Sequence, residues 1–242
     1  RALTKYLETK SCISVNSGTA ALHLALSVYD LKNKEVILPS LSFASTAHAV
    51  IYNGGIPKFV DINPETMCID ENLLENKITS KTKLIFPVHF GGTPCNMNKI
   101  KKICTNNNLF LVEDAAHAIG STYNGKKIGT HGDMVCFSFH PTKNLPTPSG
   151  GAISINSKNH KKLTEKLLSR RWCGISKRKE FSYDVDDLGW NYYMNQFSAA
   201  IGNEQLKKLD TQIKKRINAA KRYSEELVLT SKMKFDKNCA YH

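Results

Sequence analysis

Short apolar segments alternate with segments of helical periodicity from Cys12 to Arg170. Strands that are apolar on both faces, with helices between them, are typical of a mostly parallel sheet covered on both sides. The sequence therefore predicts an α/β domain with three layers, α/β/α. The expected strands are Cys12–Val15, Val36–Leu38, Lys58–Val60, Leu84–Val88, Phe110–Val112, Met134–Phe139 and Ala152–Ile155, and the expected helices are Thr19–Tyr29, Thr46–Tyr52, Met97–Asn106 and His160–Arg170.

A longer helical pattern begins at Asn195 and continues to Leu227. The segment Lys232–His242 that follows is too short to pack by itself, and we expect it to be the first strand of a further domain. The predicted organisation is one large domain, residues 1–228, that includes the long connecting helix, followed by the start of a truncated C-terminal small domain, residues 229–242. Because the chain does not begin with Met, we expect the natural N-terminus to lie upstream.

The composition excludes several classes of protein. With 41% hydrophobic and 23% charged residues the chain is typical of globular proteins. No apolar run approaches the roughly 18–20 residues of a membrane span, so no membrane partner is predicted. The net charge of +13 comes from Lys residues scattered along the chain rather than from a basic block, so no nucleic-acid partner is predicted. Such a surface would still attract an anionic small molecule.

Cysteine usage bears on the compartment. The number of cysteines is odd and no C-x-x-C pair occurs, so neither a zinc site nor a disulfide framework is expected, and no metal is predicted. With no secretory signal at the start, this usage predicts a reducing, cytoplasmic location. The seven cysteines are Cys12, Cys68, Cys95, Cys104, Cys136, Cys173 and Cys239.

Ligands of an open parallel sheet bind at the carboxyl ends of its strands, so the loops that follow the strands are the candidate sites. The first such loop is Asn16-Ser17-Gly18-Thr19. Free N–H groups at the start of the next helix, together with the hydroxyls of Ser17 and Thr19, would hold a phosphate. The alternative is an ordinary Ser/Thr helix cap.

The second candidate loop contains Asp114 and His117, in the sequence V-E-D-A-A-H. Asp114 ends an apolar strand, and a buried carboxylate at that place needs a cationic partner. The alternative role for Asp114 is another helix cap. His117, three residues on, would face the same ligand or be a structural histidine.

The third candidate is Lys143, in a loop that follows the strand ending at Phe139 and precedes Gly150-Gly151. A Lys confined in a pocket can form a Schiff base when burial and nearby cations lower the pKa of its amine. The glycine pair would permit close approach of the backbone.

Together the three loops match the needs of pyridoxal 5′-phosphate. Its phosphate requires donors, its pyridine nitrogen requires an anion such as Asp114, and its aldehyde requires an amine such as Lys143. Phe43, in the loop after another strand, would stack on the ring, with core packing as the alternative.

At these positions the sequence resembles the sugar aminotransferases of the DegT/DnrJ/EryC1/StrS family, which have the aspartate aminotransferase (type I) fold of pyridoxal phosphate enzymes. The resemblance covers nearly the whole chain in family order. The matching stretches are Ser14–Leu26 (S-V-N-S-G-T-A-A-L-H-L-A-L), Val36–Thr46, Pro87–Gly92, Val112–Gly120 (V-E-D-A-A-H-A-I-G), Phe137–Lys143 and Gly189–Leu209.

The resemblance implies a role for each candidate residue. Lys143 would form the Schiff base and move the proton, Asp114 would pair with the pyridine nitrogen, and His117 would lie near the phenolic oxygen of the ring. Phe43 takes the place of the stacking aromatic. Gly18, Thr19 and Ser138 would hold the phosphate.

The resemblance also implies an assembly and a reaction. Asn191 falls in the segment that, in the family, reaches the cofactor phosphate of the other subunit, so a homodimer with shared active sites is expected. The expected reaction is transfer of an amino group, from glutamate, to a nucleotide-linked keto sugar. The sequence does not identify the sugar, the nucleotide or the ring carbon.

Two departures from the family pattern concern the site. Pro148-Ser149 stands where the family has G-E before the Gly pair, and Tyr193 replaces an Arg often found two residues after Asn191. Two other functions stay open at this point. A dehydratase of the same family is disfavoured by Lys143, because that branch replaces the Schiff-base Lys with His. A non-catalytic member that binds cofactor or nucleotide as a regulator is disfavoured by the intact Lys143 and Asp114.

Overall fold

The computed structural model describes residues 1–227 and 235–242. A seven-stranded sheet forms its centre, in the order β1-β9-β8-β5-β4-β2-β3. All neighbouring pairs among β8, β5, β4, β2 and β3 are parallel, and β9 runs antiparallel to both β8 and β1. The predicted mostly parallel sheet is confirmed. Its strands are β1 (Ser11–Val15), β2 (Glu35–Pro39), β3 (Ile56–Val60), β4 (Thr82–Ile85), β5 (Phe110–Asp114), β8 (Met134–Ser138) and β9 (Gly151–Ile155).

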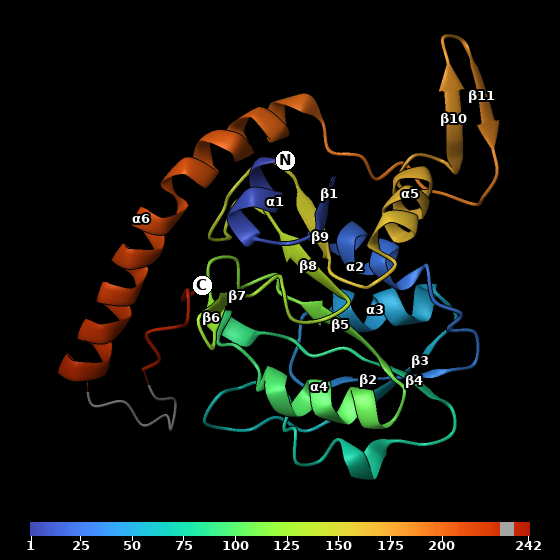
Figure 1. Cartoon of the computed structure of the whole chain (residues 1–242). Coiled ribbons are helices and arrows are strands. Elements are labelled where there is room, and N and C mark those ends of the chain that lie inside the picture. The colour runs from blue at the N-terminus through green and yellow to red at the C-terminus, as the bar shows by residue number, and fades with distance from the viewer. Residues whose placement is uncertain (228–234) are drawn as a thin grey trace.

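Helices cover both faces of this sheet (Figure 1). Successive residues of one strand pack into different clusters, since Val36 and Leu38 contact one helix layer and Ile37 the other. The first layer holds α2 (Gly18–Leu26), α3 (Ala44–Tyr52) and α5 (His160–Arg171), and the second holds α1 (Ala2–Leu7), α4 (Met97–Asn106) and α6 (Gln196–Glu226). The predicted three-layer α/β/α architecture is therefore confirmed.

The long helix α6 begins where the sequence predicts. The side chain of Asn195 caps it by accepting the Ser198 N–H at 2.8 Å. Helix α6 reaches the sheet through Leu209 and Ile213, and the Ile213 side chain lies against Gly120. A Cβ at Gly120 would lie 1.9 Å from Ile213 Cδ1, so a larger residue would displace the Ile213 side chain, and the positive φ of 91° at this position also favours glycine.

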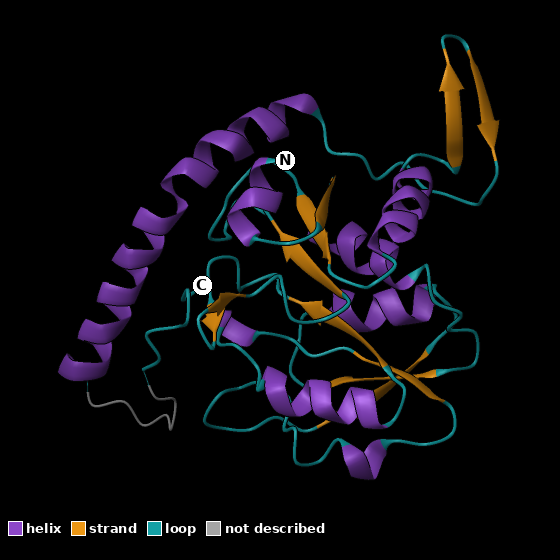
Figure 2. Ribbon diagram, viewed as in Figure 1, coloured by secondary structure: helices purple, strands orange, loops and turns teal. Residues whose placement is uncertain are grey.

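Other elements were not expected from the sequence. Helix α1, the two-stranded pairs β6 (Thr122–Tyr123) with β7 (Lys126–Lys127), and β10 (Ile175–Lys179) with β11 (Ser182–Val185) are additions. The hairpin β10–β11 projects from the body of the molecule beyond α5 (Figures 1 and 2), and Phe181 at its tip is 99% exposed. Two short 3-10 turns, η1 (Glu75–Lys77) and η2 (Phe90–Gly92), complete the described elements.

The C-terminal residues differ from the expectation. The expected strand Lys232–His242 is not formed over its described part, residues 235–242, and its first residues, 232–234, lie outside the described residues. Residues 235–242 pack on the large domain instead, where Cys239 and Ala240 are buried. The Ala240 N–H donates to Ser121 Oγ, and the Ala240 carbonyl accepts from Asn144 Nδ2. The division into a domain 1–228 and the start of a second one at 229 stays a prediction.

Candidate active site

A cavity of about 550 Å³ opens at the carboxyl ends of β5 and β8, between the starts of α2 and α3. All the expected site residues except Asn191 line it. Segments distant in the sequence meet here because parallel strands end at the same edge of a sheet. The residues brought together are Ser17, Gly18, Thr19, Phe43, Asp114, His117, Ser138 and Lys143.

One wall of the cavity is the first turn of α2. The Ser17 hydroxyl accepts the Ala20 N–H at 3.0 Å, so the helix-cap interpretation holds for this side chain. Helix geometry leaves the N–H groups of Gly18 and Thr19 without intrahelical acceptors. These two N–H groups and the positive end of the helix dipole suit an anion.

Gly18 also lies tightly against the end of β8. A Cβ built on Gly18 would lie 2.7 Å from Ser138 Cβ and 2.9 Å from its Oγ, both too close for real atoms. Only glycine therefore lets the start of α2 approach the Ser138 hydroxyl, and that approach places the hydroxyl beside the free N–H groups of the helix.

Asp114 is 3% exposed and receives two hydrogen bonds. Thr46 Oγ1 donates to Oδ2 at 2.7 Å, and the Ala116 N–H donates to Oδ1 at 3.0 Å. Burial raises the pKa of Asp114, while these two donors and the charge of Lys143 oppose the rise. A cation at the cavity side would favour the ionised carboxylate. Thr46, which lies in the first turn of α3, four residues after Ser42, was not singled out from the sequence. A hydroxyl side chain in the first turn of a helix that follows a strand end was the available signal.

His117 is held as a neutral imidazole. Its Nδ1 accepts the Gly91 N–H at 3.2 Å, so the ring proton is on Nε2. Burial, then the charges of Lys143 and His242, lowers the pKa of His117 to about 4. The ring stacks on His242 with 4.2 Å between centroids and meets Phe90 edge-on. His117 therefore offers the cavity a neutral N–H donor.

Lys143 projects its amine into the same space. Burial lowers the pKa of Lys143, and the charge of Asp114 opposes that effect. Its Nζ lies 3.1 Å from Nε2 of His242, the residue that the C-terminal segment brings to the site. A depressed pKa increases the fraction of free amine, the form that attacks carbonyl carbon.

The loop between Lys143 and β9 is tied to the phosphate-binding end. The Ser149 hydroxyl donates to the carbonyl of Asn16, the residue before the α2 cap. Gly151 leaves no room for a Cβ, which would lie 2.5 Å from the Ser17 carbonyl oxygen. Ser149, one of the departures from the family pattern, thus links two sides of the cavity.

Phe43 lines the cavity with a side chain that is 75% exposed. It precedes α3 and is absent from the packed clusters, so the core-packing alternative is wrong. An exposed aromatic face at a cavity is available to stack on a planar ligand.

Asn191 lies away from the cavity of its own chain. It pairs with Trp172 in an isolated bridge, and its carbonyl accepts from Asn16 Nδ2 at 3.2 Å. Tyr193, where the family often has Arg, stacks on Trp172 with 5.7 Å between ring centroids. The side chain of Asn191 is exposed, so it is free to meet another molecule.

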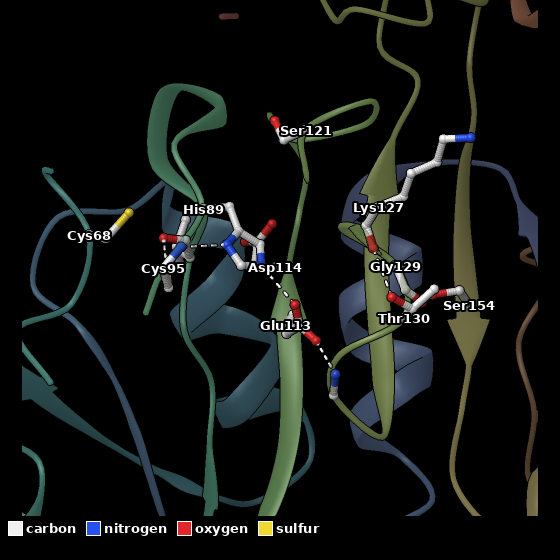
Figure 3. Close-up of polar contacts among 12 residues, drawn as sticks. Cys68, His89, Cys95, Glu113, Asp114, Ser121, Lys127, Gly129, Thr130 and Ser154 are labelled. Atoms are coloured by element: carbon white, nitrogen blue, oxygen red, sulfur yellow. Dashed lines mark hydrogen bonds and ion pairs between the residues drawn. The ribbon is translucent and has the colours of Figure 1, made fainter. Parts of the chain in front are cut away.

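A second polar group lies behind the cavity and was not expected from the sequence. His89 and Glu113 are both 0% exposed, and His89 Nε2 lies 2.8 Å from Glu113 Oε2 (Figure 3). Glu113 precedes Asp114 on β5, and His89 follows the apolar run after β4. The position of Glu113 directly before Asp114 was a usable sequence signal. Its partner His89, 24 residues away, is identified only by the structure.

Comparison with known proteins agrees with this geometry. The family model of the DegT/DnrJ/EryC1/StrS aminotransferases matches residues 1–238. GDP-perosamine synthase of Caulobacter vibrioides is 38% identical over 228 residues, which are 94% of this chain and 60% of that protein. The chain spans about three fifths of the length of the curated relatives it matches.

Solved structures give the same result. Helicobacter pylori PseC, an aminotransferase involved in the biosynthesis of pseudoaminic acid, superposes with a TM-score of 0.88 at 31% identity, over 96% of this chain and 65% of that one. NtdA from Bacillus subtilis, with bound cofactor PMP, gives a TM-score of 0.85 at 36% identity, over 93% of this chain and 50% of that one. The chain belongs to the DegT/DnrJ/EryC1/StrS aminotransferase family.

Proposed function

We propose that this chain carries the cofactor site of a pyridoxal 5′-phosphate-dependent aminotransferase that transfers an amino group, from glutamate, to a nucleotide-linked keto sugar. The observation that carries the proposal is the placement of an amine, a buried carboxylate and a helix N-terminus around one cavity. Similar proteins named for amino-sugar synthesis support the substrate class.

The residues present fit the cofactor. The N–H groups of Gly18 and Thr19, with the Ser138 hydroxyl, match a phosphate, and the space beside Ser138 exists only because residue 18 has no Cβ. Asp114, buried and lacking a Lys or Arg within ion-pair distance among the described residues, matches a protonated pyridine nitrogen. Phe43 offers its exposed face to the ring.

When bound, pyridoxal phosphate supplies an aldehyde that captures an amino group and a protonated ring that withdraws electrons. Lys143 would hold the aldehyde carbon through its Nζ. The Lys143 amine, once free, would serve as general base for the proton at Cα of the amino donor and as general acid toward C4′ of the cofactor. The pKa of Lys143, lowered by burial, suits both tasks.

Two further residues would tune this site. Asp114 would accept the pyridine N–H and keep the ring protonated, which the Thr46 and Ala116 donors support by favouring its ionised form. His117 Nε2–H would donate to the phenolic oxygen of the ring. Because the pKa of His117 is about 4, the ring is a neutral donor at pH 7.

The proposal includes a homodimer with shared sites. Asn191 of one chain would lie next to the cofactor phosphate of its partner, which accounts for its exposed position outside its own cavity. All seven cysteines are free, which supports a reducing, cytoplasmic compartment. No helix among residues 1–227 and 235–242 is long and apolar enough to cross a membrane.

The decisive experiment is Lys143→Ala with added cofactor. We expect the visible absorption band of the lysine-bound cofactor to disappear, because no other amine lines the cavity in the described residues. Borohydride reduction of the unaltered protein, followed by peptide mapping, should place the cofactor on Lys143. Label on another lysine would refute the assignment.

A further inference from the structure

Two adjacent buried acids on β5 point to opposite faces of the sheet. Asp114 faces α3, where Thr46 donates to it. Glu113 is 0% exposed and faces the other layer, and its one ion pair among the described residues is with His89. Figure 3 shows Glu113 between His89 and the loop that follows β7. A carboxylate held at this depth is costly unless donors satisfy it.

The hydrogen bonds of this pair have a fixed direction. The Cys95 N–H donates to His89 Nδ1 at 3.0 Å, so the ring proton is on Nε2, which donates to Glu113 Oε2. The Gly132 N–H donates to Glu113 Oε1. Both carboxylate oxygens are therefore acceptors, and the imidazole is neutral because a proton on Nδ1 would face the Cys95 N–H.

The pair joins β5 to the segment 87–95 at the site carboxylate. The His89 N–H donates to the Asp114 carbonyl at 3.0 Å, and the Asp114 N–H donates to the Pro87 carbonyl at 2.9 Å. These bonds extend the parallel pairing of β4 with β5 past the end of β4. The buried side-chain bond between His89 and Glu113 thus reinforces the backbone pairing that fixes Asp114.

The same segment holds the other ring-facing residue. Directly after His89, the η2 turn presents the Gly91 N–H to His117 Nδ1 at 3.2 Å. Phe90 in that turn lines the cavity and meets His117 edge-on. Whatever fixes the 87–95 segment on β5 therefore fixes the tautomer of His117 as well.

We propose that His89 and Glu113 are positioning residues for the active site: their buried hydrogen bond holds the 87–95 segment on β5 and thereby orients Asp114 and His117. The inference rests on the proposed function for the roles of these two residues. Neither His89 nor Glu113 lines the cavity, so neither touches the cofactor.

The test is Glu113→Gln, which keeps the shape of the side chain. An amide has one acceptor oxygen, so its NH₂ group must face either the Gly132 N–H or the His89 N–H. His89 cannot relieve this conflict by changing tautomer, because Cys95 donates to its other nitrogen. Residues that orient metal ligands typically contribute about 10–100-fold, and by analogy we expect cofactor affinity to fall by about tenfold.

A second readout needs no cofactor. In the free protein, NMR titration should give a His117 pKa near 4. In Glu113→Gln we expect this pKa to rise, because a displaced 87–95 segment takes Phe90 away from the ring and reduces the burial that is the largest cause of the low value. The charges of Lys143 and His242, the two smaller causes, are unchanged, so the rise should be partial.

Asp133→Asn is the matched control. Asp133 is a partly buried acid beside β5 that lies outside the cavity, and its Oδ2 accepts the Leu111 N–H at 3.1 Å. We expect this variant to lose stability without a change in cofactor affinity or in the His117 pKa. Equal shifts in both variants would overturn the proposal, as would unchanged values in a folded Glu113→Gln protein.

The double variant His89→Gln/Glu113→Gln keeps the proposal testable if the single variant fails to fold. Its two amides can pair with each other while the amide oxygen at position 113 still accepts the Gly132 N–H, so we expect partial recovery relative to Glu113→Gln. No recovery in the folded double variant would count against the proposal. If the unaltered protein does not bind the cofactor at all, the proposed function fails, while the His117 titration still decides the positioning role.

Discussion

Asp114→Asn separates the electrostatic role of this carboxylate from its structural one. The structure accommodates the amide: its oxygen can accept the Ala116 N–H, and its NH₂ can donate to Thr46 Oγ1. Thr46 then turns its own proton to Ser42 Oγ, 2.6 Å away. No buried group loses a partner, so the fold should tolerate the change.

The loss of charge is not compensated. A neutral amide does not stabilise a protonated pyridine, and charge-directed contacts in closed sites contribute about 3–4 kcal/mol. Since each 1.36 kcal/mol is a tenfold change in rate, we expect the amino-donor half-reaction to slow by about 10²–10³. Single-turnover absorbance measurements with glutamate give this rate directly.

Although Asp114→Asn should slow the reaction, it should raise the stability of the cofactor-free protein at pH 7. Burial raises the pKa of Asp114, so the folded state holds its proton more tightly than the unfolded chain does. This stabilisation is complete below the unfolded pKa of about 3.9 and is lost as the pH rises through the folded value. Asparagine does not titrate, so the variant should melt at a higher temperature than the unaltered protein at pH 7.

Two results would refute this reasoning. A near-normal half-reaction rate in Asp114→Asn would show that the carboxylate is only a structural cap. A lower melting temperature for the cofactor-free variant at pH 7 would show that the buried charge stabilises the fold.

Two other predictions concern the phosphate end and the assembly. Gly18→Ala should weaken cofactor phosphate binding at least tenfold in a spectral titration, because the new Cβ meets Ser138 Cβ at 2.7 Å. Gly18→Ala/Ser138→Gly relieves this contact but loses the Ser138 hydroxyl, so we expect partial recovery. Unchanged affinity in the single variant would contradict the contact. Mixing inactive Lys143→Ala with an inactive Asn191 variant should restore activity, because one site of the heterodimer keeps both residues. Subunit exchange without recovery would exclude shared sites.

The fold was predictable because short, largely apolar strands alternate with segments of helical periodicity. The direction of β9 was not, because periodicity carries no direction. One cue was present: residues 139–150 between β8 and β9 contain no helical pattern, whereas parallel neighbours require a crossover. Helix α1 and the hairpin β10–β11 were missed because they have little buried surface, so no hydrophobic pattern distinguishes them.

In the candidate site, the residues that directly follow strand ends were predictable. Asp114 and Lys143 follow strands, and parallel strands gather their ends at one edge. Their partners were not predictable, because Thr46 and His242 reach them from 68 and 99 residues away. Contacts at that separation depend on how helices dock, which the local sequence does not encode.

The position of β9 has a consequence for the order of events during synthesis. Strand β1 lies at the edge of the sheet, and β9 is its one neighbour in the sheet. Until residue 155 has left the ribosome, β1 lacks the strand β9 with which it pairs, so the phosphate-binding turn that follows β1 is not held against Ser138 at the end of β8. The cofactor can therefore bind only after the chain has been synthesised through β9. Because it binds the native form alone, the cofactor would also shift the folding equilibrium toward the native state.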